Sequence, residues 1–308
     1  MNFVTPNKEE INPFLQLLLL LFYGIAGALV FSILGIVFAV CIYGFGLLSN
    51  LEVLLSGDAK YIDGLKVLQI MASIGTFIAP AIALALTERQ KVSNFFGLHK
   101  PKFLFFAIVL LIMISSLPLM EWTAIWNQKM VLPQFLKGIE QWMKAKEDEA
   151  MNMTIKLLTV RNNFDFLVNL FMIAVLPAIG EELVFRGGVQ RSLNRAFNNP
   201  HLAIWLSAII FSAIHVQFYG FIPRMLLGAG FGYLYYFSGN LWYAMAAHFI
   251  NNAYAVCAAF YMQKHHMPLD KADEPIGFPW YGYLISAIIT IALFKFFKDS
   301  AERERKLD

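Results

Sequence analysis

The chain has 308 residues, of which 58% are hydrophobic and 15% are charged, and its mean hydropathy is +0.59. Soluble domains are about 45–50% apolar and about 25% charged, so this composition excludes an ordinary soluble domain and predicts an integral membrane protein. The net charge of +3 gives no reason to expect a nucleic-acid partner, and two cysteines, Cys41 and Cys257, cannot build a disulfide framework or a cysteine metal site.

Three apolar stretches, at about 14–48, 65–86 and 103–120, are predicted to be the first membrane spans, since a spanning helix needs about 20 mostly apolar residues. The first stretch is longer than a signal-peptide core and follows no basic segment, so we interpret it as a retained span. It is also too long for an upright helix, and we expect it to tilt, to extend beyond the bilayer, or to bend at one of its glycines, Gly24, Gly27 or Gly35.

The connection at residues 121–163 is the largest segment predicted to lie outside the spans. Apolar side chains recur there at helical spacing, at Phe135, Ile139, Trp142 and Met143, opposite Lys137 and Lys144. This pattern predicts an amphipathic helix. The helix either lies on the membrane surface or packs over the mouth of the bundle, and the sequence leaves both positions open.

Four core spans follow at about 164–185, 202–218, 222–237 and 241–262, and a last span lies at about 280–297. The chain is therefore predicted to be one integral membrane domain, residues 1–308, with an all-α fold. It is a polytopic bundle of about eight spans: three in residues 14–120, four in the core at 164–262, and the last one. The core is where we expect the active site.

The distribution of positive charge predicts the orientation of the chain. An even number of spans places both termini on one side, and basic residues are more numerous on that side once the long connection is discounted. Long connections count for less than short ones in this comparison. Both termini are therefore predicted to be cytoplasmic.

Six polar residues lie inside or at the ends of the core spans, and each is costly at membrane depth. They are Glu181, Glu182, Arg186, His215, His248 and Asn252. Ionisable groups persist at such depth where they face a bundle interior or a water-filled cavity, so each is a functional-site hypothesis.

The first motif joins two carboxylates to one arginine. Glu182 and Arg186 are four residues apart and share a helix face, so they are able to pair. Glu181 points about 100° away around the helix, and an unpaired carboxylate there suits a general base. Pro177 cannot donate to the carbonyl of Ile173 and is expected to kink the helix before the pair. The alternative is an ordinary charged cluster where a helix ends at the lipid headgroups.

Two further spans supply imidazoles. His215 is nearly the only ionisable group of its span, and such a histidine is often structural. His248 and Asn252 are four residues apart on one face, where they would join helices, offer two donors to an oxyanion, or supply metal ligands. Taken together, three spans provide a base, a partner imidazole and two donors, which are the parts needed for water to attack a peptide carbonyl.

Three motifs occur in order on the core spans: Glu181-Glu182-x-x-x-Arg186, Phe211-x-x-x-His215 and His248-x-x-x-Asn252. They resemble the motifs of the CAAX-protease and bacteriocin-processing family of intramembrane proteases, also called CPBP or Abi, which includes the CAAX prenyl endopeptidases. The resemblance covers about residues 164–262. The residues of the first motif, Glu-Glu-Leu-Val-Phe-Arg-Gly, resemble the prokaryotic branch more than the eukaryotic enzymes. This resemblance implies a prokaryotic cell membrane and a substrate that is a peptide or a membrane protein in the lipid bilayer.

The resemblance also implies a role for each motif residue. Glu181 would activate water with His215 as its partner, and His248 and Asn252 would form the oxyanion hole. Glu182 and Arg186 would hold Glu181 and the local helix, and Phe211 would be a packing residue. Gly228-x-x-x-Gly232 fits a close helix-packing interface without a catalytic role.

The resemblance leaves the metal question open, because the family has been described both as metalloproteases and as glutamate proteases. Glu181, His215 and His248 would be the ligands of a divalent metal such as zinc. Against zinc, no span carries the His-Glu-x-x-His pair that gives two ligands from one helix face, and asparagine is a poor zinc ligand. We therefore expect a glutamate-type enzyme without a cofactor.

The sequence thus predicts an intramembrane endopeptidase that cuts near the cytoplasmic face. One alternative is a non-enzymatic immunity or scaffold protein in which the same polar residues join the helices. Another is a proton-coupled transporter, which also needs Glu and His at membrane depth. The sequence gives no prediction of the oligomeric state.

Overall fold

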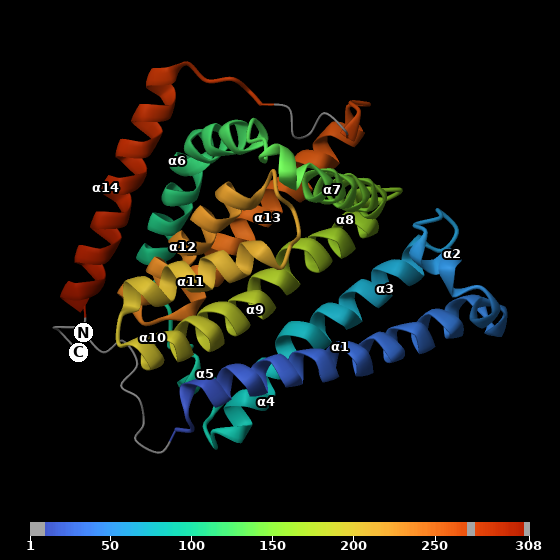
Figure 1. Cartoon of the computed structure of the whole chain (residues 1–308), viewed down its shortest axis with the longest axis horizontal. Coiled ribbons are helices and arrows are strands. Elements are labelled where there is room, and N and C mark those ends of the chain that lie inside the picture. Colours follow the sequence, from blue (N-terminus) through green and yellow to red (C-terminus); the bar gives the residue numbers. More distant parts are fainter. Residues whose placement is uncertain (1–9, 270–274, 305–308) are drawn as a thin grey trace.

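The computed structural model describes residues 10–269 and 275–304, and all regular elements in these ranges are helices (Figure 1). This confirms the predicted all-α fold. Five of the described helices are long and apolar enough to cross a membrane: Pro13–Tyr43, Ile62–Thr87, Phe103–Gln128, Asn163–Phe197 and Trp280–Glu304. Three further helices, at residues 200–213, 221–238 and 241–264, coincide with the remaining predicted stretches.

The N-terminal region is a pair of long antiparallel helices (blue and cyan in Figure 1). Helix α1 (Pro13–Tyr43) is unbroken over 31 residues. Its partner is one continuous helix made of α3 (Ile62–Ser73), the π-helical turn Ile74–Ile78, and α4 (Ala79–Thr87), and the short helix α2 (Leu51–Leu55) lies in the connection between the two.

The glycines of α1 are packing positions and do not interrupt the helix. A Cβ atom added at Gly27 would lie 2.1 Å from the carbonyl oxygen of Gly75, so two backbones touch at this crossing. A Cβ atom at Gly35 would meet Leu68 at 2.9 Å. Small residues allow this close approach, which stabilises helix pairs in lipid.

The middle of the chain contains α5 (Val92–Phe95), α6 (Phe103–Gln128) and α7 (Lys137–Leu158). The third predicted span is therefore too short, because α6 continues to Gln128 and carries Trp122 and Trp126 on its exposed surface. Helix α7 occupies most of the long connection, and Figure 1 shows it at the end of the bundle away from the marked termini.

The central helix runs without a break through 35 residues, Asn163–Phe197. It contains α8 (Asn163–Asn169), α9 (Leu176–Glu182) and α10 (Arg191–Phe197), joined by π-helical segments at Leu170–Val175 and Leu183–Gln190. The predicted end of this span near residue 185 is wrong. The charged motif lies in the middle of the helix, because neighbouring helices bury it and no contact with water is needed. Pi-helical insertions of this kind often accompany functional sites.

Three of the last helices pack against the central one: α11 (Pro200–Ala213), α12 (Phe221–Ser238) and α13 (Leu241–Lys264). Helix α14 (Trp280–Glu304) packs on α6 and α12 at the outside of the bundle (Figure 1). Helix α11 is shorter than its predicted span, and residues 214–220 form a loop before α12. Fully buried apolar residues such as Leu84, Val109 and Leu234 form a core that α4, α6 and α12 share. This core fixes the helices whose polar faces form the site.

Candidate active site

A buried ion pair lies at the centre of the site. Arg186 Nη1 donates to Glu182 Oε1 at 2.8 Å, and neither side chain is more than 1% exposed. The same oxygen lies 2.8 Å from Nδ1 of His248, which comes from α13. The predicted pairing of Glu182 with Arg186 is therefore present, and the carboxylate also holds an imidazole.

Arg186 is enclosed by aromatic rings and a close backbone. Its Nη2 donates to the carbonyl oxygen of Gly228 at 2.7 Å, and its guanidinium lies 4.6 Å from the ring centre of Phe211. A Cβ atom at Gly228 would come within 3.1 Å of that Nη2, so the glycine allows the contact. Four residues on, Gln190 Nε2 donates to the carbonyl oxygen of Gly232 at 3.1 Å. The Gly228-x-x-x-Gly232 motif thus receives polar side chains of the central helix.

His248 stands between the two glutamates. Its Nδ1 faces Glu182, its Nε2 lies 3.9 Å from Glu181 Oε2, and its ring stacks on Phe231 with 5.3 Å between centres. Since Glu182 is already ion-paired with Arg186, we assign the hydrogen of the short contact to Nδ1 of the histidine. The Nε2 atom therefore faces Glu181.

Glu181 has a carboxylate oxygen without a hydrogen bond. Its Oε2 atom is buried, and no donor among the described residues reaches it. The 3.9 Å separation from His248 is too long for a direct hydrogen bond. An unpartnered carboxylate oxygen that faces an imidazole nitrogen is suited to accept a proton from a small donor placed between the two.

His215 lies in the loop after α11, and its predicted place inside the helix is wrong. Helix α11 ends at Ala213, and Nδ1 of His215 contacts the carbonyl oxygen of Phe211 at 2.7 Å, so this nitrogen is the donor. Phe211 touches the rings of both His215 and His248, at 5.0 and 5.9 Å between centres. Among the described residues, no hydrogen bond or ion pair joins His215 to Glu181.

Asn252 has a contact that sequence reasoning missed. Its Nδ2 donates to the carbonyl oxygen of Ile173 at 3.0 Å, and its Oδ1 accepts from Asn251 at 3.1 Å. Ile173 is four residues before Pro177, which has no N–H to offer that carbonyl. The asparagine therefore replaces the hydrogen bond that the proline removes. The orphaned carbonyl was visible in the sequence, but its donor on another helix was not.

The histidines and Glu181 do not form a compact metal centre. In residues 10–269 and 275–304, no three His, Cys, Asp or Glu side chains gather as ligands of one ion would. Glu181 and His248 face each other, but the contacts of His215 are with Phe211. The donor set as arranged does not fit a three-ligand site, and metal independence stays a prediction.

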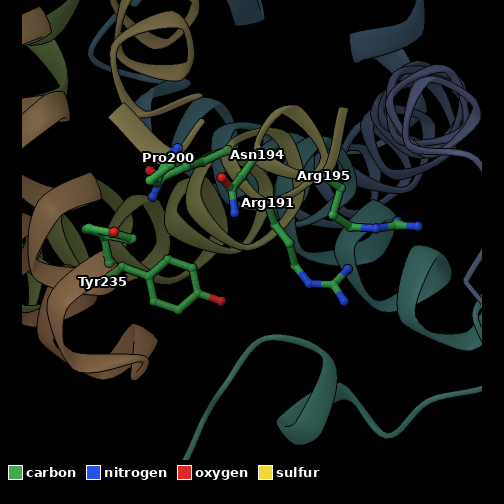
Figure 2. Close-up of a pocket in the computed structure, with 7 residues that line it drawn as sticks. Arg191, Asn194, Arg195, Pro200 and Tyr235 are labelled. Carbon is green, nitrogen blue, oxygen red and sulfur yellow. The ribbon is translucent and has the colours of Figure 1, made fainter. Parts of the chain in front are cut away.

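A second polar cluster lies further along the central helix, around a pocket lined in part by Gln190, Arg191 and Arg195 (Figure 2). Arg191 and Arg195 both form ion pairs with Glu10. Burial raises the pKa of Glu10, but the hydrogen bonds of Arg191 and Gln90 and the charges of Arg191 and Arg195 together hold that pKa below its ordinary value. This cluster ties the segment before α1 to the central helix and is separate from the glutamate–histidine site.

Comparisons with known proteins find matches that cover this region of the chain. Residues 163–254 match the family model described as type II CAAX prenyl endopeptidase Rce1-like, and the matched range contains all six candidate residues. A curated relative in Bacillus subtilis (strain 168), uncharacterized protein YpbD, is 30% identical over 112 residues, which are 35% of this chain and 53% of the relative. The chain thus spans about half the length of the relative it matches. No solved structure matches the chain.

Proposed function

We propose that the chain hydrolyses peptide bonds within the bundle, because residues 163–254 of this membrane protein match the family model of the Rce1-like type II CAAX prenyl endopeptidases. The observation that carries the proposal is the buried Oε2 atom of Glu181, which has no hydrogen bond and faces Nε2 of His248 at 3.9 Å. A base, an imidazole and a shielded environment are the minimum requirements for activating water.

In the proposed reaction, Glu181 takes a proton from water while the water oxygen forms a bond to the peptide carbonyl carbon. The resulting oxyanion is stabilised by nearby N–H donors. The carbon–nitrogen bond then breaks, and the proton on Glu181 passes to the leaving amine. No electron transfer is involved, and no step requires a metal.

The contacts support a division of roles around Glu181. Glu182, held by Arg186, orients His248 through Nδ1, so its second nitrogen faces the reacting atoms. His215 likewise uses its Nδ1 hydrogen on the Phe211 carbonyl, which leaves Nε2 free to accept a hydrogen bond from water. Asn252 donates one hydrogen of its Nδ2 to the Ile173 carbonyl oxygen, and its second Nδ2 hydrogen is available to the oxyanion.

We propose a peptide or membrane-protein substrate that reaches the site from the end of the bundle that α7 covers. Glu181 lies near the middle of the 35-residue central helix, and the loop with His215 contacts α7. The first turn of α1 and the last turn of α14 belong to the opposite end (Figure 1). With entry at the α7 end, cytoplasmic termini and cleavage near the cytoplasmic face cannot both hold. The side of the membrane on which α7 lies decides which of these two predictions is correct.

A labelling experiment fixes that side. In a Cys41→Ser/Cys257→Ser background, Lys144→Cys on α7 and Arg303→Cys on α14 are exposed to a membrane-impermeant maleimide in whole cells. Cytoplasmic termini require labelling at position 144 without lysis. Labelling at position 303 would reverse the orientation and place α7 in the cytoplasm.

The catalytic proposal is tested by comparing wild type with Glu181→Gln, which keeps the shape of the side chain. Membrane fractions with the two proteins are compared by proteomics, and cleaved peptides are then assayed with purified protein in lipid. We expect the variant to lose about 10²–10⁴-fold in kcat, the usual contribution of a general base. Equal cleavage by both would reject the proposal, and an unchanged biological effect would favour the non-enzymatic alternative.

Metal independence has its own measurement. Purified protein is analysed for bound metal, and cleavage is measured before and after treatment with a strong chelator. We expect full activity after chelation. Stoichiometric zinc that is lost together with activity would contradict the glutamate-type proposal.

A further inference from the structure

The loop at residues 214–220 carries His215, and residues that belong to none of the three motifs hold it in place. Its two ends are joined by Ser212 Oγ, which donates to the carbonyl oxygen of Phe221 at 2.7 Å. Val216 within the loop has a positive φ of 53°, a conformation uncommon for a branched residue. Such a loop keeps its shape only where its surroundings hold it.

Asn127, near the end of α6, fixes the second half of this loop. The side chain is 1% exposed, and both ends of its amide are used. Its Nδ2 donates to the carbonyl oxygen of Phe218 at 2.9 Å, and its Oδ1 accepts from the N–H of Ile222 at 2.7 Å. Helix α6 thus holds the loop where it enters α12.

Glu147 on α7 fixes the middle of the loop. Its Oε2 accepts from the N–H of Tyr219 at 3.1 Å. Burial is the largest influence on this carboxyl and raises its pKa, although the Tyr219 N–H and the charge of Arg224 act in the opposite direction. Arg224 also donates to Gln217 in the same loop. Helix α7 is therefore connected to the segment that carries His215.

Helix α7 shows three different faces, because successive residues turn by about 100°. The face with Glu147 is half-buried against the bundle. A second face carries the apolar side chains of Phe135, just before the helix, Ile139 and Trp142, which are 83%, 51% and 54% exposed. The third face is polar and carries Lys144. Within the described part of the chain, no protein neighbour covers this apolar face.

The apolar face of α7 continues the lipid-facing surface of α6. Trp122 and Trp126 on the last turns of α6 are 50% and 54% exposed, and Val131 between the helices is 78% exposed. Helix α6 is long and apolar enough to span the membrane, so its tryptophans lie where such residues concentrate, at the boundary of the lipid. An adjoining helix with an apolar face and lysines on another face suits the same boundary.

We propose that α7 is a membrane-surface helix whose contact with lipid sets, through Glu147, the position of the loop that carries His215. Glu147 is a positioning residue in this arrangement. The importance of His215 rests on the proposed function, but lipid contact and loop order are measurable without any catalytic activity.

The experiment uses the full chain in nanodiscs of zwitterionic and anionic phospholipids. One variant, Phe135→Ser/Ile139→Ser/Trp142→Ser, removes the apolar face, and a second, Glu147→Ala, removes the link. The matched control is Glu147→Gln, whose amide oxygen still accepts from Tyr219. Amide hydrogen exchange of residues 214–220 reports loop order, and kcat and KM are measured on a cleaved peptide.

We expect both variants to raise exchange in the loop at least tenfold and to lower kcat several-fold with a smaller effect on KM. Glu147→Gln should stay close to wild type. Because both changes interrupt one connection, combining them should add little to either alone. Full additivity, or an unchanged loop in the triple variant, would overturn the proposal.

Lipid contact is measured separately with Ile139→Cys, labelled with a fluorophore in the Cys41→Ser/Cys257→Ser background. Brominated acyl chains should quench the label at this position, and absence of quenching would show that the occupant of the apolar face is not lipid. If wild type cleaves no peptide while exchange and quenching behave as expected, the proposed function fails and the positioning of the loop stands.

Discussion

Helix α1 and the central helix Asn163–Phe197 have similar lengths, 31 and 35 residues, and both are apolar enough to span a membrane. Their surroundings differ greatly. In the most apolar part of α1, 17% of the residues are buried, against 50% in the central helix. The first helix lies at the outside of the bundle and the second runs through it (Figure 1).

This difference explains where charge is tolerated. Helix α1 buries one polar side chain, Gln16, which bonds to Glu88 and Ser192. The central helix buries Glu181, Glu182 and Arg186 at its middle. Glu182 and Arg186 pair with each other, and the pair is enclosed by His248, Phe211, Phe231 and the Gly228 carbonyl on other helices. Charge at membrane depth therefore marks a helix that is surrounded by protein, and it does not mark the end of a span.

The largest loss of stability is expected at the buried ion pair. Arg186→Met leaves Glu182 charged and without its main partner, which costs about 3–5 kcal/mol at such sites. Unfolding by a denaturing detergent in mixed micelles measures the change. The control is Lys298→Met, which removes an exposed pair with Glu302 and should cost less than about 1 kcal/mol. Equal effects would mean that burial of the pair does not matter.

A smaller loss is expected where α1 touches its partner. Gly27→Ala places a Cβ atom 2.1 Å from the Gly75 carbonyl oxygen and must push the helices apart, at a cost of about 1–3 kcal/mol. At Gly24 the nearest atom to a new Cβ is 3.6 Å away, so Gly24→Ala serves as the matched control. The same unfolding assay compares the two, and a tolerant Gly27 would show that α1 is only loosely attached.

A loss of about 1 kcal/mol is expected from Asn252→Leu, in the range of hydrogen bonds between helices in membranes. The change leaves the Ile173 carbonyl without its donor. Asn251→Leu removes a neighbouring amide that does not reach that carbonyl and should cost less. Thermal unfolding in one detergent ranks the two variants. If Asn251→Leu lowers the stability more than Asn252→Leu, the contact with Ile173 does not account for the contribution of this pair.

The smallest effect is expected on the lipid-facing side of α1. Leu29 is 63% exposed, so Leu29→Ala should change the free energy of unfolding by no more than about 0.5 kcal/mol. The thermal assay used for Asn252 is sufficient. A cost above 2 kcal/mol would indicate that another copy of the chain or another protein covers this face.

Local patterns predicted much of this molecule. Apolar runs gave the helices, and spacing of four residues gave the Glu182–Arg186 pair and the shared face of His248 and Asn252. Contacts between helices could not be predicted from the sequence. Nothing local indicates that Glu182 binds His248, that His215 lies beyond the end of α11, or that charge at residue 186 is followed by eleven more helical residues.

Three residues around the loop were also missed as part of the site: Asn127, Glu147 and Arg224. Asn127 and Arg224 were visible as polar residues beside or within an apolar stretch, and Glu147 stands in a run of charged residues. Their significance depends on a loop whose backbone groups need partners, and the sequence does not show which carbonyl or N–H is left unpaired.

The contact of Asn252 with the Ile173 carbonyl makes Pro177 and Asn252 interdependent. A chain with an ordinary residue in place of Pro177 would regain an N–H beside that carbonyl. The amide of Asn252 would then no longer be needed as the donor to Ile173. The two positions are therefore expected to covary among relatives of this chain. A substitution at either Pro177 or Asn252 should therefore be designed together with the other position.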